Sequence, residues 1–247
     1  MVTPETGTNP DLATKQRQFN AAMALYNGSR RYQLFSAGVA VINIALQLTL
    51  LARLIPLHVP LVWQPPLLLT AYFITDFING LVHMIMDHSD RYTSLAGPLI
   101  ANFHLHHKIP RYQDHALPVI YFNETGSKVW LVPTLGAVLA LTCVEGISLY
   151  LLTLLIYVGV LSSVAEVSHY LCHNSTATFS VFLARCGLLL DKRHHACHHL
   201  HDNQNYAFLN GWSDPLLNRI ALAIYPGYKR TTDLHFATYV PPDGDKR

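Results

Sequence analysis

The sequence predicts an all-helical integral membrane protein, with about four transmembrane helices and a histidine-rich helical cap on the cytoplasmic side. Composition supports this fold class, because 51% of the residues are hydrophobic, only 13% are charged and the mean hydropathy is +0.22. Apolar runs alternate with polar segments along the chain. Most of the 15 histidines lie near the ends of those runs or in the polar segments between them.

The chain divides into a polar N-terminal arm, residues 1–29, and a membrane domain, residues 30–247. The arm lacks the apolar core of a signal peptide, and we expect it to be mobile, with a helix from Asp11 onward. Four apolar runs follow, at residues 34–57, 67–86, 129–144 and 147–167. The third run is short for a span, and Glu145-Gly146 predicts a turn after it. Two further apolar segments are expected to lie in the membrane interface: residues 179–190 and 215–225.

The distribution of positive charge predicts the orientation of the spans. If four spans are drawn with both termini in the cytoplasm, all of the 17 lysines and arginines except Arg53 lie on the cytoplasmic side. This asymmetry follows the positive-inside rule. It also places the histidine-rich segments on the same face of the membrane.

Charge and cysteine content argue against other classes of protein. A net charge of +2 provides no strong basic field for nucleic acid. The four cysteines show no CxxC spacing, and we interpret them as reduced thiols. Cys172 and Cys197 lie inside histidine clusters, but neither is paired with another cysteine, which disfavours them as metal ligands.

The densest histidine cluster is the segment 193–199, RHHACHH. His195, His198 and His199 stand at i, i+3 and i+4, so a helix would place three imidazoles on one face, with His194 adjacent. A histidine-rich solvated loop is the ordinary alternative for one such cluster. Further histidine clusters occur elsewhere in the chain, and their number favours a metal site. The other clusters are His83 and His88, then His104, His106 and His107, then His115, and finally His169 and His173.

The second apolar run carries a polar stripe. Asp76, Asn79, His83 and Asp87 are spaced to share one face of a helix. A carboxylate inside a span is costly and indicates function. We expect Asp76 to accept the free N–H of a metal-binding imidazole, and hydrogen bonding to a neighbouring helix is the alternative.

These clusters form a pattern of four parts: residues 75–87 (TDFINGLVHMIMD), 103–125 (from FHLHH through His115 to NET), 169–173 (HYLCH) and 193–212 (from RHHACHH to NGW). The pattern resembles the membrane lipid desaturases that contain a lipid desaturase domain. That family includes the plasmanylethanolamine desaturases and the plant plastid enzymes that place a trans double bond in the palmitate of phosphatidylglycerol. The resemblance covers about residues 70–225, and its last part is the most specific.

The resemblance implies an O₂-dependent di-iron enzyme that introduces a double bond into a fatty acyl or alkyl-ether chain of a membrane lipid, for example in the conversion of a plasmanyl to a plasmenyl lipid. Removing hydrogen from an unactivated C–H bond requires O₂ and a redox metal. Many imidazoles with few carboxylates suit two metal ions that keep open coordination positions. Iron fits these ligands best, although ligand counting also admits copper, zinc and manganese.

The candidate metal ligands come from all four parts of the pattern: His83, His106, His107, His115, His169, His173, His195, His198 and His199. Further ligands or supporting residues are expected among Asp76, Asp87, His88, His104 and His194. Electrons must come from a separate donor, a ferredoxin or a cytochrome b5-like protein, because the chain has no CxxCH haem motif and no GxGxxG motif. Lys192, Arg193 and Arg111 could bind an acidic donor or a lipid phosphate, or could act only as positive-inside anchors.

Two other functions remain compatible with the sequence. A lipid hydroxylase would use the same ligands, because the outcome depends on how the substrate is positioned. A non-enzymatic metal transporter or sensor would place histidines along the spans, whereas here they cluster at span ends and in the cytoplasmic segments. The oligomeric state and the identity of the lipid remain open.

Overall fold

The computed structural model describes residues 10–108, 115–201 and 203–225, and every regular element in those ranges is a helix. The predicted all-helical class is therefore confirmed. Arg111 lies outside the described residues. In chain order the elements are α1 (Pro10–Gly28), α2 (Arg30–Leu54), η1 (Ile55–Leu57), η2 (Leu61–Trp63), α3 (Gln64–Asp87), α4 (Gly97–Lys108), α5 (Leu117–Thr125), α6 (Leu131–Leu141), α7 (Leu149–Asn174), α8 (Thr178–Arg185), α9 (Lys192–Leu200) and α10 (Asp214–Ile224).

Three helices are long and apolar enough to cross a membrane: α2, α3 together with η2, and α7. They correspond to the first, second and fourth predicted runs. At 1.5 Å per residue, the 25 residues of α2 and the 26 residues of α7 exceed the roughly 30 Å of a bilayer core. The third run forms α6, whose 11 residues are too few to cross alone.

Proline and glycine set two of the helix boundaries. Pro65 and Pro66 lie in the first turn of α3, where a missing N–H removes no intrahelical hydrogen bond. Gly146 has a φ of +82° between α6 and α7, a conformation that glycine adopts without steric cost. The predicted turn at Glu145-Gly146 is confirmed.

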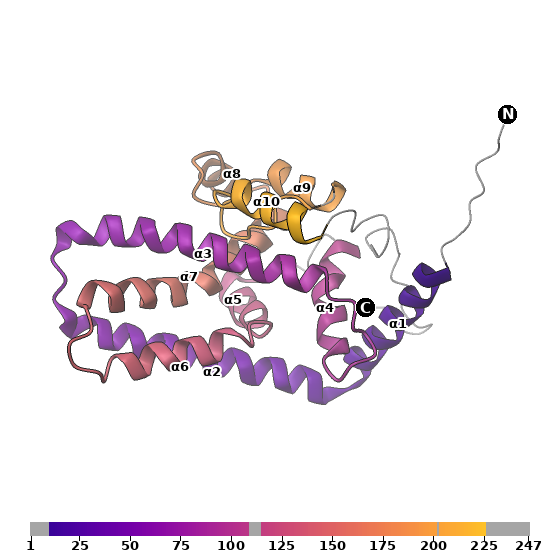
Figure 1. Ribbon diagram of the computed structural model, residues 1–247, viewed down its shortest axis with the longest axis horizontal. Coiled ribbons are helices and arrows are strands. Elements are labelled where there is room, and N and C mark those ends of the chain that lie inside the picture. Colours follow the sequence, from indigo (N-terminus) through magenta and orange to yellow (C-terminus); the bar gives the residue numbers. More distant parts are fainter. Residues whose placement is uncertain (1–9, 109–114, 202, 226–247) are drawn as a thin grey trace.

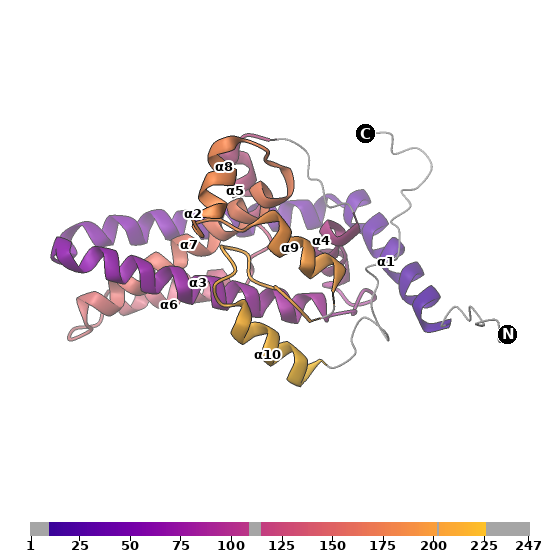
Figure 2. The same ribbon diagram turned by 90° about the horizontal axis from the view of Figure 1, so that it is seen from above.

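The long helices run side by side, as Figure 1 shows, with α1 and α4 at one end of the bundle. Contacts of α3 with α7, and of α2 with α5 and α6, hold the bundle together. Helices α8, α9 and α10 form a cap next to α3, and Figure 2 shows the cap from above. The cap therefore lies beside the histidine-bearing ends of α3 and α7.

The interior of the bundle holds polar side chains beside its apolar clusters, and the outer surface exposes apolar side chains. On α2, Asn43 and Gln47 are buried while Leu48 is exposed. Gln47 Nε2 donates to the carbonyl of Gly159 at 3.0 Å and to Ser163 Oγ at 2.8 Å, both on α7. Lipid solvates an apolar outer surface and leaves interior polar groups to bond with each other, so this arrangement suits a membrane protein.

Part of the N-terminal arm is docked against the rest of the chain. The helix that was expected from Asp11 onward is α1, which contacts α4. Phe19 and Met23 of α1 are buried in one cluster with Tyr92 and Ala101. The arm was expected to be mobile, but these apolar side chains anchor α1 because they leave water on packing against α4.

A buried ion pair crosses the interior of the bundle. Lys128 Nζ lies 2.7 Å from Glu166 Oε1 and donates to Asn79 Oδ1 at 2.5 Å. Lys128, which the charge distribution predicts to lie on the cytoplasmic side, has its side chain buried between α3 and α7. Burial of the ammonium group is tolerable because these two partners replace water.

The ion pair gives a test of the interior. Lys128→Met should lower the free energy of unfolding by about 3–5 kcal/mol, because it leaves the Glu166 carboxylate buried without a cation. Thermal unfolding in detergent measures the change. The double variant Lys128→Met/Glu166→Gln should regain part of the loss, since both charges are then absent. The control Lys15→Met breaks the ion pair with Asp90, which is partly exposed, and should cost less than about 1 kcal/mol. Equal melting of Lys128→Met and the unmodified protein would contradict the buried pair.

Candidate metal centre

The predicted histidine clusters meet where the last turns of α3 and α7 approach α4 and α9. Eight imidazoles and one carboxylate gather there in two groups. The carboxylate-containing group consists of His83, Asp87, His106, His107 and His198. The all-histidine group consists of His169, His173 and His195, with His199 beside them.

Asp87 connects three imidazoles of the carboxylate-containing group. Its Oδ2 lies 3.2 Å from His83 Nε2 and 3.2 Å from His198 Nε2. Its Oδ1 lies 3.1 Å from His107 Nε2, and the Nε2 atoms of His107 and His198 are 3.4 Å apart. All four side chains are buried. The predicted stripe on α3 therefore does bring His83 and Asp87 to one site.

Four Nε2 atoms converge in the all-histidine group. His195 Nε2 lies 3.0 Å from the Nε2 atoms of His169, His173 and His199, and those of His169 and His173 are 3.1 Å apart. Such separations suit nitrogens that share one metal ion at bond lengths of about 2.0–2.1 Å. The His199 ring also lies 4.7 Å from the His107 ring, centroid to centroid, so the two groups are adjacent.

Backbone carbonyls orient three of the imidazoles. Each of the three donates its Nδ1–H to a carbonyl oxygen: His83 to Tyr206 at 2.7 Å, His106 to Phe103 at 2.6 Å and His198 to Gln204 at 2.9 Å. Because Nδ1 carries the proton, Nε2 presents its lone pair to the group. Metal-binding histidines are held in this way.

Burial favours the neutral form of four of the imidazoles. Desolvation lowers the pKa of His106, His195, His198 and His199 below the ordinary value, and neighbouring imidazoles lower it further. Neutral imidazole is the form that binds a metal ion. The buried Nε2 of His106 has no hydrogen-bond partner in the described part of the chain, and a metal ion would satisfy it. The donor set therefore fits metal binding.

Helix α9 contributes to both groups. Asp191 caps its N-terminus and accepts two backbone N–H bonds from the first turn. The predicted helical spacing is confirmed, since His195, His198 and His199 all face the centre. His198 belongs to one group, while His195 and His199 belong to the other.

Four candidate histidines lie outside both groups. His88 and His104 each donate a ring N–H to a backbone carbonyl of α3. The side chain of His115 is exposed. His194 donates its Nε2–H to Asp214 at 2.6 Å, and this hydrogen bond raises the pKa of His194. These four histidines are left out of the ligand set proposed below.

Asp76 supports the site through the backbone. Its buried carboxylate accepts five hydrogen bonds of 2.7–3.3 Å, four from backbone N–H groups and one from a hydroxyl, all within residues 209–213. We expected it to accept from a metal-binding imidazole, but the described donors to it all come from this segment. The same stretch of chain, residues 203–213, carries the carbonyls that orient His83 and His198. Asp76 thus orients these imidazoles indirectly, through the backbone of residues 203–213.

The segment 203–213 belongs to the site, although the pattern of candidate ligands did not predict it. The Phe208 ring lies 4.1 Å from the His83 ring and 4.2 Å from the His169 ring, measured between centroids. At Gly211 a Cβ atom would lie 2.7 Å from His194 Nε2, and φ is +88°, so glycine is required there. The resemblance over residues 205–206 and 210–212 was the signal that could have identified this segment.

Asp76→Asn tests this support. The amide has one carbonyl acceptor and no charge in place of two carboxylate oxygens, so we expect the free energy of unfolding to fall by about 3 kcal/mol. Thermal unfolding in detergent, together with faster proteolysis within residues 203–213, measures the effect. The matched control Asp90→Asn removes a partly exposed carboxylate and should change stability by less than about 1 kcal/mol. If both variants behaved alike, the role assigned to Asp76 would be wrong.

Comparison with known proteins agrees with this geometry. Residues 72–224 match the family model described as the lipid desaturase domain, and this match covers more than half of the chain. No curated protein and no solved structure matches the chain. The matched residues include both histidine groups and the segment 203–213. The chain belongs to the membrane lipid desaturase family defined by this domain.

Proposed function

We propose that the protein is an O₂-dependent di-iron desaturase that introduces a double bond into a fatty acyl or alkyl-ether chain of a membrane lipid. Membership of the family already identifies a desaturase-type oxidoreductase with a lipid substrate. The observation that carries the finer proposal is the convergence of eight imidazoles and Asp87 in two adjacent groups. A single metal ion would leave one group of buried donors unused.

In this proposal each group holds one iron ion. The carboxylate-containing group supplies His83, Asp87, His106, His107 and His198, and the all-histidine group supplies His169, His173, His195 and His199. Bound iron would supply the redox chemistry with O₂ that an unactivated C–H bond requires. The net reaction converts –CH₂–CH₂–, O₂, two electrons and two protons into –CH=CH– and two water molecules. A ferredoxin or a cytochrome b5-like protein would supply the electrons.

The chain's own residues orient and enclose the centre. The carbonyls of Phe103, Gln204 and Tyr206 hold the imidazoles with Nε2 toward the groups. The rings of Phe103 and Phe208 pack against His83 and form an apolar wall. Such a wall excludes water from the centre and suits contact with a hydrocarbon chain.

For the membrane topology we propose four crossings, with both termini and the histidine groups on the cytoplasmic side. Helices α5 and α6 follow each other along α2 and α7, so together they could make the crossing that α6 is too short to make alone. The positive-inside asymmetry supports the orientation. We propose residues 1–29 as the arm and residues 30–247 as one membrane domain.

Two native cysteines test this topology. Cys143 lies in the turn after α6, Cys186 follows α8, and both are exposed. In variants that keep one of the two and carry serine at the other cysteines, a membrane-impermeant maleimide should label Cys143 in intact cells. It should label Cys186 only after permeabilisation. Labelling of both from the same side would contradict four crossings, and full labelling in denaturant controls for thiol reactivity.

Metal content tests the ligand assignment. Elemental analysis of the detergent-purified protein should find about two irons per chain. His198→Ala should lose one or both, because it removes a buried ligand. His115→Ala is the matched control and should retain both, since that side chain is exposed and outside the groups. Unchanged iron in His198→Ala, or one zinc per chain in the unmodified protein, would contradict the di-iron centre.

The product distinguishes the proposal from its closest rival. A lipid hydroxylase could use the same ligands, and it would add 16 mass units to the chain, whereas desaturation removes two hydrogens. Lipid mass spectrometry of cells with and without the protein separates the two reactions. His198→Ala should abolish the product and His115→Ala should not. Iron binding without either product would indicate a non-enzymatic metal-binding role.

A further inference from the structure

We propose that a cavity next to the metal centre binds the phosphate group of a lipid. The cavity has a volume of about 420 Å³ and lies between the end of α7, helix α8 and the start of α9. Its size is within the range of small-molecule sites, roughly 300–1,000 Å³. The proposal rests on the proposed function only in taking a lipid as the source of the phosphate.

The lining of the cavity carries an excess of positive charge. Arg185, Lys192 and Arg193 line it together with one acidic residue, Asp191. The three cations make no ion pair with any residue in the ranges that the structure describes. The Asp191 carboxylate is already engaged as the N-cap of α9. Within the described residues, nothing therefore occupies these cations, and they can bind an anion.

The remaining lining suits a phosphate ester attached to apolar chains. Ser175 and Ser180 place their hydroxyl oxygens 3.1 Å apart at the cavity, where hydroxyl groups could donate to phosphate oxygens. Leu171, Val181 and Leu190 line it with apolar side chains. Arginine can bind two phosphate oxygens at once, and lysine adds a mobile ammonium group. The cavity thus combines cations, hydroxyl groups and hydrocarbon.

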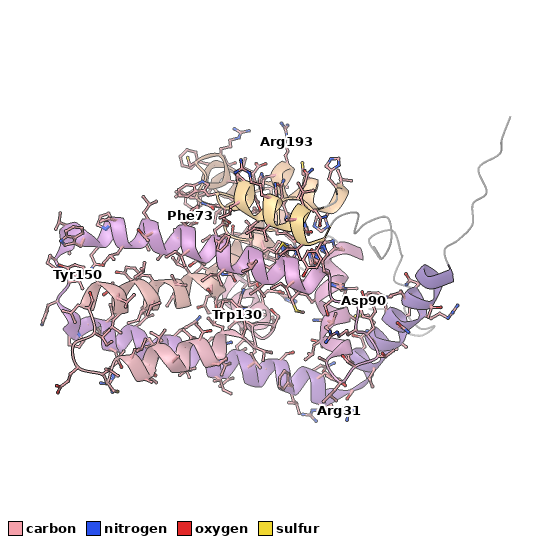
Figure 3. The ribbon with its side chains drawn as sticks, viewed as in Figure 1. Arg31, Phe73, Asp90, Trp130, Tyr150 and Arg193 are labelled. Carbon is pink, nitrogen blue, oxygen red and sulfur yellow. The ribbon has the colours of Figure 1, made fainter. Side chains whose placement is uncertain are left out.

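The position of α8 favours a lipid over a free phosphate. Phe179 and Phe182 on this helix are 70% and 57% exposed. Aromatic side chains exposed on a short amphipathic helix indicate contact with the membrane interface, where lipid phosphates lie. Figure 3 shows Arg193 at the outer side of the cap, and Arg185 ends α8. The exposed aromatic side chains therefore lie on the same short helix as Ser180, Val181 and Arg185, which line the cavity.

The cavity also shares two helices with the metal centre. Cys172 lines it from α7, between His169 and His173 of the all-histidine group. Lys192 and Arg193 line it from α9, less than one turn before His195. A lipid whose phosphate is bound here would have its chains next to the proposed irons. The cavity would then position the substrate, while the histidine groups would carry out the oxidation.

Binding of labelled lipids to the detergent-purified protein tests this inference without turnover. The probes are fluorescent phosphatidic acid and the matching fluorescent diacylglycerol, which differ only in the phosphate group. Fluorescence polarisation should show that Arg185→Gln/Lys192→Gln weakens phosphatidic acid binding about tenfold and leaves diacylglycerol binding unchanged. The matched control Arg91→Gln/Arg219→Gln removes the same charge from exposed positions outside the cavity and should bind as the unmodified protein does.

Three outcomes would overturn the inference. They are equal weakening in both double variants, unchanged binding in the cavity variant, and displacement of phosphatidic acid by inorganic phosphate at similar concentration, which would indicate a site for free phosphate. Circular dichroism and gel filtration must first show that each variant is folded. Iron content is measured on the same preparations, because an absence of iron would count against the di-iron proposal and not against the cavity.

Discussion

The carboxylate of Asp76 is the contact on which the assembled site depends. It is buried in α3, where an ionised group without partners would be strongly destabilising. The backbone of residues 209–213 supplies four donors to it, and the Ser213 hydroxyl supplies a fifth. Because the carboxylate needs these donors, the non-helical segment 203–213 packs against α3. This packing places the Gln204 and Tyr206 carbonyls against His198 and His83. The carboxylate inside the helix thus helps to determine where the imidazoles of His83 and His198 point.

Other buried polar groups in the interior also require hydrogen-bond partners. Gln47, Asn79, Lys128 and Glu166 all find partners on neighbouring helices, and the outer surface is left to apolar side chains. Hydrocarbon around the bundle offers no hydrogen bonds, so each interior polar group specifies which helix must lie next to it. The polar contacts therefore define which helices are neighbours, and apolar side chains in van der Waals contact fill the space between these polar groups.

Much of the fold and the centre of the site could be predicted because both depend on local spacing. Apolar length identified α2, α3 and α7, and the i, i+3, i+4 pattern identified the inward face of α9. Positions that depend on distant partners could not be predicted in this way. Lys128 lies in the interior because Glu166 is there, and a count of charges along the chain cannot include that partner.

His115 shows the same limit within the site. It follows a histidine-rich segment closely in the sequence, yet its side chain is exposed, because nearness in the sequence does not determine where an irregular segment directs a side chain. The segment 203–213 was hard to identify for the opposite reason. It contributes backbone carbonyls and an aromatic ring to the site, and neither has the signature of a metal ligand.

Because one short helix contributes to both groups, the two irons of the proposed centre would not bind independently. The nine residues of α9 direct His198 to one group and His195 and His199 to the other. An ion in either group would restrain the helix and so order ligands of the second group before the second ion arrives. Loading would then be cooperative, with protein that holds a single ion as the minor species. The centre would exchange between empty and complete forms, which would limit the population of a half-loaded enzyme.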